Sequence, residues 1–302
     1  MTICISAICE NYNMIVTASD RMITTGDVQF EPDSRKVIPL TRSIFLLIAG
    51  DTPLQYEIIR QLKIDVDDRI EKDPTDWLNV SDVADLYAKY YFQVKRQKAE
   101  NEILRPLGLD SDSFISRQKN MDQDFISKIS NAIVYFKMDI IETIITGIDN
   151  RGAHIFKFEN EKNQDFDGVG FASIGYGMRH SESEFMFAGH SGFRKLPETL
   201  LLAYSAKKRA EVAPGVGEAT DMHLIGPYLG YNYQFTEDDP IFPKIEEIYK
   251  KTKSSIADLN VLANIEIKSY LEELLKQASK QAQEMKKPNE VIEEKKPEIP
   301  KT

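Results

Sequence analysis

The opening of the chain constrains the fold most, because its first fifty residues hold four short apolar runs separated by brief turns. The runs occupy residues 2–8, 14–19, 36–40 and 43–49, and their lengths and bounding turn residues are typical of β-strands. Turns as short as 10–13 and 41–42 leave no room for a crossover helix, so neighbouring strands must run antiparallel. The sequence therefore predicts an antiparallel sheet at the N-terminus.

Helical periodicity then replaces the strand pattern, and the two patterns continue to alternate in blocks. A helix is predicted from Pro53, with Thr52 as its cap and Leu54, Ile58, Ile59 and Leu62 on one face. Further helices are predicted at 81–104, 124–137, 183–188 and 197–212, and further strands at 140–148, 153–158, 171–175 and 221–225. Such segregated blocks predict an α+β layered domain in which helices pack outside two antiparallel sheets.

No Gly/Ser-rich linker or repeat divides the 302 residues. We therefore expect one domain over 1–238 with a helical insert at about 65–137, followed by a helical extension over 239–280. Residues 281–302 are mostly lysine, glutamate and proline, so they bury too little apolar surface to offset their ordering entropy. This tail is expected to be disordered.

Charge and the lack of cofactor motifs exclude several functional classes. With 48 acidic against 38 basic residues, the net charge of -10 disfavours binding to a nucleic-acid backbone. No apolar run reaches membrane-span length and the N-terminus lacks signal-peptide features, so we expect a cytoplasmic protein without membrane contact.

Cys4 and Cys9 are interpreted as buried small hydrophobes. The four histidines are scattered and no phosphate-binding loop is present, so we expect no metal or cofactor.

The N-terminus itself offers a nucleophile. Removal of Met1 is expected before a residue as small as Thr2, and it would leave a hydroxyl and a free amine on one residue. An α-amine with a pKa of about 7.7–8.0 can accept a proton near neutral pH, which makes it a base for that hydroxyl. The chemistry also needs a nearby cation, a carboxylate to orient it and an N–H for the oxyanion. Lys36, Asp20 and Gly50 are the candidates.

These residues stand in motifs that resemble a known family. The motifs are Thr2-Ile3-Cys4, Ala18-Ser19-Asp20-Arg21, Arg35-Lys36-Val37 and Ala49-Gly50-Asp51-Thr52. In order and spacing they resemble the start of proteasome β-type subunits and their bacterial relatives HslV and Anbu, which are N-terminal nucleophile hydrolases. The resemblance implies a four-layer α-β-β-α sandwich and a threonine peptidase or amidase. It also implies that Thr2 is the nucleophile and that Gly50 is the oxyanion-hole residue. Lys36 would be the lysine that lowers the proton affinity of the nucleophile, and Asp20 the aspartate that holds this lysine.

The same resemblance implies a peptide or amide substrate and a homo-oligomeric ring or spiral, and it is compatible with an ATP-driven unfoldase partner. Three departures leave alternatives open. The interval from Thr2 to Asp20 is two residues longer than usual. A longer turn can absorb this difference. Alternatively, Met1 lies at the nucleophile position, and the site is then inactive. Tyr176 replaces a serine of the family, and the later Asp-x-x-Ser has no clear match. An inactive structural subunit and a non-peptide amidase are the alternative functions.

Overall fold

The computed structural model describes residues 2–25, 28–32, 35–73, 78–235 and 239–252. The chain divides into two compact units, Met1–Ile245 and Glu246–Thr302. In the second unit the described residues are 246–252, and these are helical. The extension expected over 239–280 is thus described only as far as residue 252, and the charged tail expected over 281–302 lies outside the described residues. The elements below belong to the first unit.

The first sheet has five antiparallel strands in the order β10-β1-β2-β11-β12. Their bounds are β1 (Cys4–Cys9), β2 (Met14–Ser19), β10 (Phe171–Ile174), β11 (Asp221–Ile225) and β12 (Asn232–Phe235). Every residue of β1, β2, β10 and β11 is buried, so both faces of the central strands are covered. The few polar residues in these strands, such as Thr17 and His223, are buried as well.

The second sheet also has five antiparallel strands, in the order β5-β6-β7-β8-β9. They are β5 (Val37–Pro39), β6 (Ile44–Gly50), β7 (Ile141–Asp149), β8 (Gly152–Glu159) and β9 (Lys162–Asp165), and a separate two-stranded ribbon is formed by β3 (Ile23–Thr25) and β4 (Val28–Phe30). Strands β3, β4, β9 and β12 are additions to the sequence-based expectation. The polar sequence of β9 lacks the apolar pattern by which the other strands were found, and β12 alternates polar and aromatic residues over only four positions.

The described part of this unit also contains the helices α1 (Thr52–Lys72), α2 (Val80–Ala99), α3 (Ser111–Arg117), α4 (Gln123–Val134), α5 (Met178–Phe187) and α6 (Leu196–Ala210), and residues 241–245 are helical as well. Between α2 and α3 the chain forms a π-helical turn (Glu100–Leu104) and a 3-10 turn (Arg105–Leu107), and a second 3-10 turn (Gln118–Asn120) follows α3. The helix N-cap predicted at Thr52 is wrong. Asp51 caps α1, because its side chain accepts a hydrogen bond from the Leu54 N–H at 2.8 Å.

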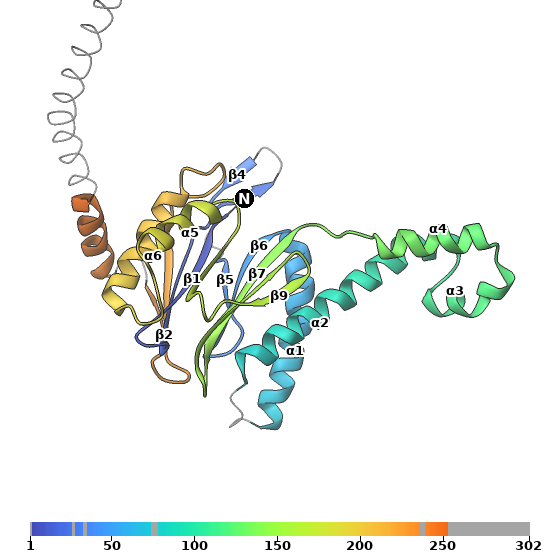
Figure 1. The fold of residues 1–302 in the computed structure, drawn as a ribbon, viewed down its shortest axis with the longest axis horizontal. Helices are drawn as coiled ribbons and strands as arrows, with labels where there is room; N and C mark the ends of the chain where they lie inside the picture. The colour runs from blue at the N-terminus through green and yellow to red at the C-terminus, as the bar shows by residue number, and fades with distance from the viewer. Residues whose placement is uncertain (1, 26–27, 33–34, 74–77, 236–238, 253–302) are drawn as a thin grey trace, which may run out of the picture. The chain divides into compact units, whose positions relative to one another are not determined.

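Helices α1, α2, α5 and α6 cover the outer faces of the two sheets, which face each other (Figure 1). Between the sheets, Ile8 and Ile15 of the first pack with Leu47 and Ile144 of the second in one buried cluster. A second cluster lies on the other face of the second sheet, where residues such as Leu46 meet α1 and α2. Helices α5 and α6 pack on the first sheet. The protein is therefore a mixed α and β structure with antiparallel sheets, as the order of its elements predicts.

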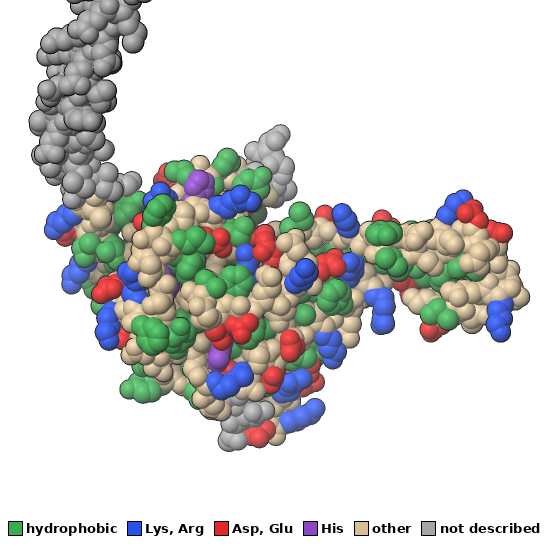
Figure 2. Space-filling view, in the orientation of Figure 1, with side chains coloured by type: hydrophobic (Ala, Val, Ile, Leu, Met, Phe, Trp, Pro, Cys, Tyr) green, Lys and Arg blue, Asp and Glu red, His purple; other side chains and the backbone are tan. Residues whose placement is uncertain are grey.

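Helices α3 and α4 lie beyond the end of α2, away from the two sheets (Figure 1). None of the α4 residues is fully buried. On the face seen in Figure 2, basic and acidic side chains are interspersed and do not gather into a patch of one sign. Within the described ranges, the helices lack the combination of length and apolar character that crossing a membrane requires.

Candidate active site

Asp20 is the centre of the candidate site. It follows β2 directly, is fully buried, and accepts four hydrogen bonds. One carboxylate oxygen, Oδ1, receives the Thr2 hydroxyl at 2.5 Å, the Ile3 N–H at 2.9 Å and the Lys36 ammonium at 2.7 Å. The other oxygen receives the Gly217 N–H at 2.9 Å. A buried carboxylate with its acceptor sites occupied in this way has a fixed orientation.

Thr2 lies just before β1 and is 5% exposed. Four residues, 10–13, connect β1 to β2, and Glu10, Asn11 and Tyr12 in this turn all adopt positive φ angles of 51° to 63°. Both strands then pair without interruption, from Cys9 opposite Met14 onward. In this register Thr2 is the residue whose hydroxyl reaches the carboxylate.

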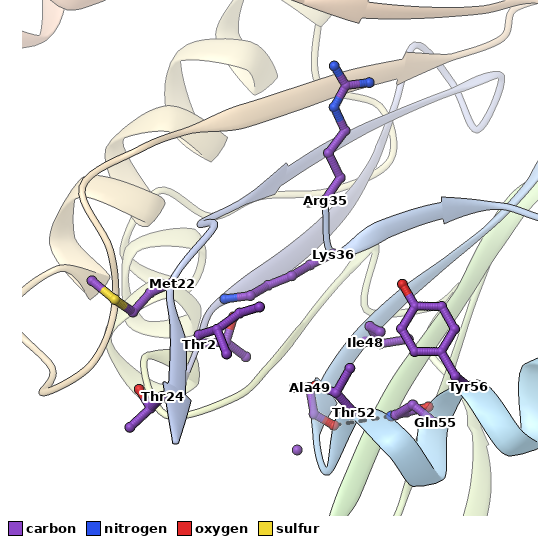
Figure 3. Close-up of a pocket in the computed structure, with 12 residues that line it drawn as sticks. Thr2, Met22, Thr24, Arg35, Lys36, Ile48, Ala49, Thr52, Gln55 and Tyr56 are labelled. Carbon is purple, nitrogen blue, oxygen red and sulfur yellow. Dashed lines mark hydrogen bonds between the residues drawn. The ribbon is translucent and has the colours of Figure 1, made fainter. Parts of the chain in front are cut away.

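Lys36 precedes β5 and reaches the same site from the second sheet. Its side chain is 12% exposed, and its ammonium forms the ion pair with Asp20. Figure 3 shows this side chain extending toward Thr2. Because the Thr2 hydroxyl and the Lys36 ammonium bind the same carboxylate oxygen, a positive charge is held within a few ångströms of the hydroxyl.

Gly50 ends β6 in a conformation that requires glycine. Its φ angle is +95°, and a Cβ atom at this position would lie 2.2 Å from the carbonyl oxygen of Ile140. Any other residue would therefore combine a strained backbone with a steric clash. The glycine predicted as a site residue is fixed by the close approach of β6 to the start of β7.

The hydrogen bonds around Gly50 show which way its N–H points. The Asp51 N–H donates to Ile140 O at 3.2 Å, on the β7 side, whereas the Ile48 N–H donates to Lys36 O at 3.1 Å, on the β5 side. Successive N–H groups along a strand point to opposite sides. The Gly50 N–H therefore points to the β5 side, just past the last residue with which β5 pairs, and toward the pocket.

Thr2, Lys36 and Gly50 line one pocket with a volume of about 210 Å³. Its other walls come from β3, β6 and α1, and include Ile48 and Tyr56 (Figure 3). The pocket thus presents a hydroxyl, a cation and a backbone N–H to the same space. A group that enters it can meet a nucleophile and an oxyanion donor together.

A turn at Gly175–Gly177, in which Tyr176 replaces a serine of the family that the motifs resemble, packs directly against Thr2. Gly175 has a φ of +91°, and a Cβ there would lie 2.4 Å from Thr2 O. The Gly177 N–H donates to the same Thr2 oxygen at 3.3 Å. Between them, Tyr176 is 67% exposed. In the sequence, the two closely spaced glycines are the signal that this turn approaches another backbone segment closely, because glycine has no side chain to prevent it.

Lys207 and the loop after α6 form a second layer that the sequence did not reveal. The Lys207 ammonium is fully buried and donates to the carbonyls of Gly217 and Glu218, both at 2.8 Å, and to the Glu211 carboxylate at 2.5 Å. Burial lowers the pKa of Lys207 to about 8, against the opposing effect of Glu211. The lysine holds the loop whose Gly217 N–H binds Asp20. In the sequence it is one of three consecutive basic residues at a helix end and carries no distinguishing signal.

The two cysteines are not candidate nucleophiles. Cys4 and Cys9 are free and buried, which confirms their interpretation as small buried residues. Burial raises the pKa of Cys4 to about 12, so it remains a protonated thiol at neutral pH and is a poor nucleophile. Among the described residues, no group of three or more His, Cys, Asp or Glu is arranged to hold a metal ion.

Comparison with known proteins adds no identification. No known protein-family model matches this chain, and neither does any curated protein. The geometry of the site and the resemblance of its motifs are therefore the observations that bear on function.

Proposed function

We propose that this chain is an N-terminal threonine hydrolase, an endopeptidase or amidase of the proteasome β-type, HslV and Anbu-like family of N-terminal nucleophile hydrolases. One observation carries the proposal: a single buried oxygen of Asp20 binds both the Thr2 hydroxyl and the Lys36 ammonium. The two layers of helices outside two facing antiparallel sheets are compatible with the four-layer sandwich of that superfamily.

In the proposed reaction, removal of Met1 frees the Thr2 amine, which accepts the proton from Thr2 Oγ1 as that oxygen attacks a substrate carbonyl. The amine then gives the proton to the leaving amine, and water resolves the acyl-enzyme. The Lys36 ammonium stabilises negative charge developing on the hydroxyl oxygen, and Asp20 keeps that ammonium in place. The site thus needs no metal or cofactor for this sequence of steps.

The Gly50 N–H is the proposed donor to the oxyanion of the tetrahedral intermediate. It points into the pocket that Thr2 lines, and strand pairing leaves it on the side where β5 has ended. Loss of one such donor typically lowers turnover by about 10²- to 10³-fold. Gly50 acts through its backbone, so its contribution depends on the orientation of the peptide group to which the N–H belongs.

By the same resemblance, we propose a homo-oligomeric assembly in the cytoplasm that takes peptide or amide substrates, with an ATP-driven unfoldase as a compatible partner. One observation favours an inactive, structural subunit instead. Tyr176 occupies the turn against Thr2 where the family has a serine, and its side chain is 67% exposed, so it offers the site no hydroxyl comparable to that serine. The chemistry of Thr2 decides between the two.

The test is the state and reactivity of the N-terminus. Intact mass and N-terminal sequencing of the native protein are expected to give a chain that begins at Thr2. A peptide epoxyketone is expected to label Thr2, as located by peptide mapping, and Thr2→Ala is expected to abolish the labelling. Ser6→Ala is the matched control, because Ser6 lies on the adjacent strand β1 and its hydroxyl binds Thr146 between the sheets at 2.9 Å. Retention of Met1, or labelling that survives Thr2→Ala, would refute the mechanism.

A further inference from the structure

Gln55 occupies an unusual position beside the proposed oxyanion donor. It lies in the first turn of α1, is fully buried, and borders the pocket. Its side-chain Nε2 donates to two backbone carbonyls, that of Ala49 at 3.1 Å and that of Glu142 at 3.0 Å. Ala49 and Glu142 are opposite each other where β6 pairs with β7. A helix side chain is therefore bound at the last paired residues before Gly50.

The bond to Ala49 bears directly on Gly50, because the Ala49 carbonyl and the Gly50 N–H belong to the same peptide group. That group is planar, so its C=O and N–H point in opposite directions and turn together. When Gln55 holds the carbonyl on the β7 side, the N–H is directed to the pocket side. Rotation of this peptide would break the Gln55 bond and move the N–H away from the pocket.

The orientation of the Gln55 carboxamide is itself fixed by two other side chains. Its Oε1 accepts hydrogen bonds from the Tyr87 hydroxyl at 2.8 Å and from the Thr143 hydroxyl at 3.0 Å, and the two hydroxyls are 2.7 Å apart. The reversed carboxamide would place Oε1 against the two backbone carbonyls, which have no hydrogen to donate. The network therefore keeps Nε2 on Ala49. Tyr87 is fully buried in α2, so this helix supports the same peptide group.

We propose that Gln55 is a positioning residue that orients the Gly50 N–H for oxyanion binding, with Tyr87 and Thr143 holding Gln55 in the required orientation. The inference rests on the proposed function, in which that N–H is the oxyanion donor. Strand pairing with Glu142 also holds Ala49, so Gln55 contributes part of the orientation. We accordingly expect about a 10-fold effect on the chemical step, less than the 10²- to 10³-fold typical for losing the donor.

The variant Gln55→Met keeps the length of the side chain and removes both of its hydrogen-bonding groups. Labelling by a peptide epoxyketone is measured over a range of probe concentrations, which separates the maximal labelling rate from the concentration for half-maximal rate. We expect the maximal rate to fall about 10-fold and the half-maximal concentration to remain unchanged. Tyr87→Phe leaves the Nε2 bonds in place, so it is expected to lower the maximal rate less. Tyr87→Phe removes a single hydroxyl, so its labelling rate can still be measured if Gln55→Met folds poorly.

Thr146→Val is the matched control for general loss of a buried hydroxyl. Thr146 lies on β7 like Thr143, but its hydroxyl binds Ser6 and the His154 carbonyl instead of Gln55. It is expected to label at the wild-type rate. If Thr146→Val slows labelling as much as Gln55→Met does, the effect is general and the inference is wrong. A change confined to the half-maximal concentration would mean that Gln55 binds the probe, and would also overturn it.

A crystal structure of Gln55→Met gives a readout that does not depend on activity. We expect the Ala49–Gly50 peptide to be rotated or to adopt more than one orientation, whereas Thr146→Val retains the wild-type orientation. If wild-type protein is not labelled at Thr2, the proposed function fails, but the orientation of this peptide still tests the role of Gln55. An unchanged peptide in Gln55→Met would refute the inference.

Discussion

Substitution of Asp20 by asparagine keeps the shape of the side chain but removes its charge and one of its two acceptors. In the more favourable orientation, the amide oxygen takes the position of Oδ1 and retains the bonds from Thr2, Ile3 and Lys36. The amide nitrogen then lies where Oδ2 was, 2.9 Å from the N–H of Gly217. Two donors face each other there, so that hydrogen bond is lost.

The expected loss of stability follows from these contacts. Removing one partner of a buried ion pair typically costs about 3–5 kcal/mol, because the other charge stays buried without compensation. The Lys36 side chain is 12% exposed and can gain some hydration, which favours the lower end of that range. The unpaired Gly217 N–H adds about 1 kcal/mol. We therefore predict that Asp20→Asn lowers the free energy of unfolding by about 4 kcal/mol.

Urea unfolding at pH 7, followed by circular dichroism, measures this difference. Asp124→Asn is the control, because the ion pair of Asp124 with Lys128 is 2.7 Å long but highly exposed, and its loss should cost about 1 kcal/mol or less. The double variant Asp20→Asn/Lys36→Met tests the origin of the cost. It removes the stranded charge and should be more stable than Asp20→Asn alone by about 1–3 kcal/mol.

Two results would contradict this reasoning. A cost for Asp20→Asn no larger than that of Asp124→Asn would mean that the carboxylate is not the buried anchor described here. A double variant less stable than Asp20→Asn would mean that the Lys36 charge is not stranded by loss of Asp20. Neither result depends on whether the protein is a hydrolase.

Two further predictions concern other buried charges. Lys207→Met should lower the free energy of unfolding by about 2–4 kcal/mol in urea titrations, because it leaves buried carbonyl groups without a hydrogen-bond donor. Lys208 is a more exposed neighbour, so Lys208→Met should cost about 1 kcal/mol or less. Equal effects of the two substitutions would count against the role of Lys207. The hydrogen bond that His154 Nδ1 donates to the Asp167 carboxylate raises the pKa of His154 above its ordinary 6.5, so protonation favours the folded state. The free energy of unfolding should therefore fall as pH rises from about 6.5 through the raised pKa. In His154→Gln this pH dependence should be lost. A wild-type free energy of unfolding that rises over the same pH range would contradict the prediction.

Much of the fold is predictable because its strongest signals are local. Strands β2 and β11 occupy the predicted ranges 14–19 and 221–225, and both consist of buried residues bounded by turns. The polar strand β9 has no such signal, since its Lys-Asn-Gln-Asp sequence is largely exposed. Its strand conformation comes from pairing with β8, a contact that apolar periodicity does not encode.

The candidate site also has a part that the sequence predicts and a part that it does not. Sequence motifs indicate Thr2, Asp20, Lys36 and Gly50. The structure joins Thr2 and Lys36 to one carboxylate oxygen of Asp20, and Gly50 lines the same pocket as Thr2 and Lys36. The supporting groups were not predictable. Gly217 contributes a backbone N–H, which any residue except proline carries, and it meets Asp20 across 197 positions of sequence. Only the folded structure relates such distant positions.

This long separation makes the site a late product of folding. Strand β11, which follows Gly217, lies beside β2 within the first sheet, so β2 presents an open edge until residues 221–225 have been synthesised and have paired. Bringing such distant segments together requires closing a long loop, which slows folding and leaves an apolar edge exposed in the meantime. A nascent chain that ends before Gly217 lacks one donor to Asp20 and all of β11, so its candidate site is expected to be incomplete. Assembly of the contacts around Thr2 and Asp20 is in this way coupled to completion of the first sheet.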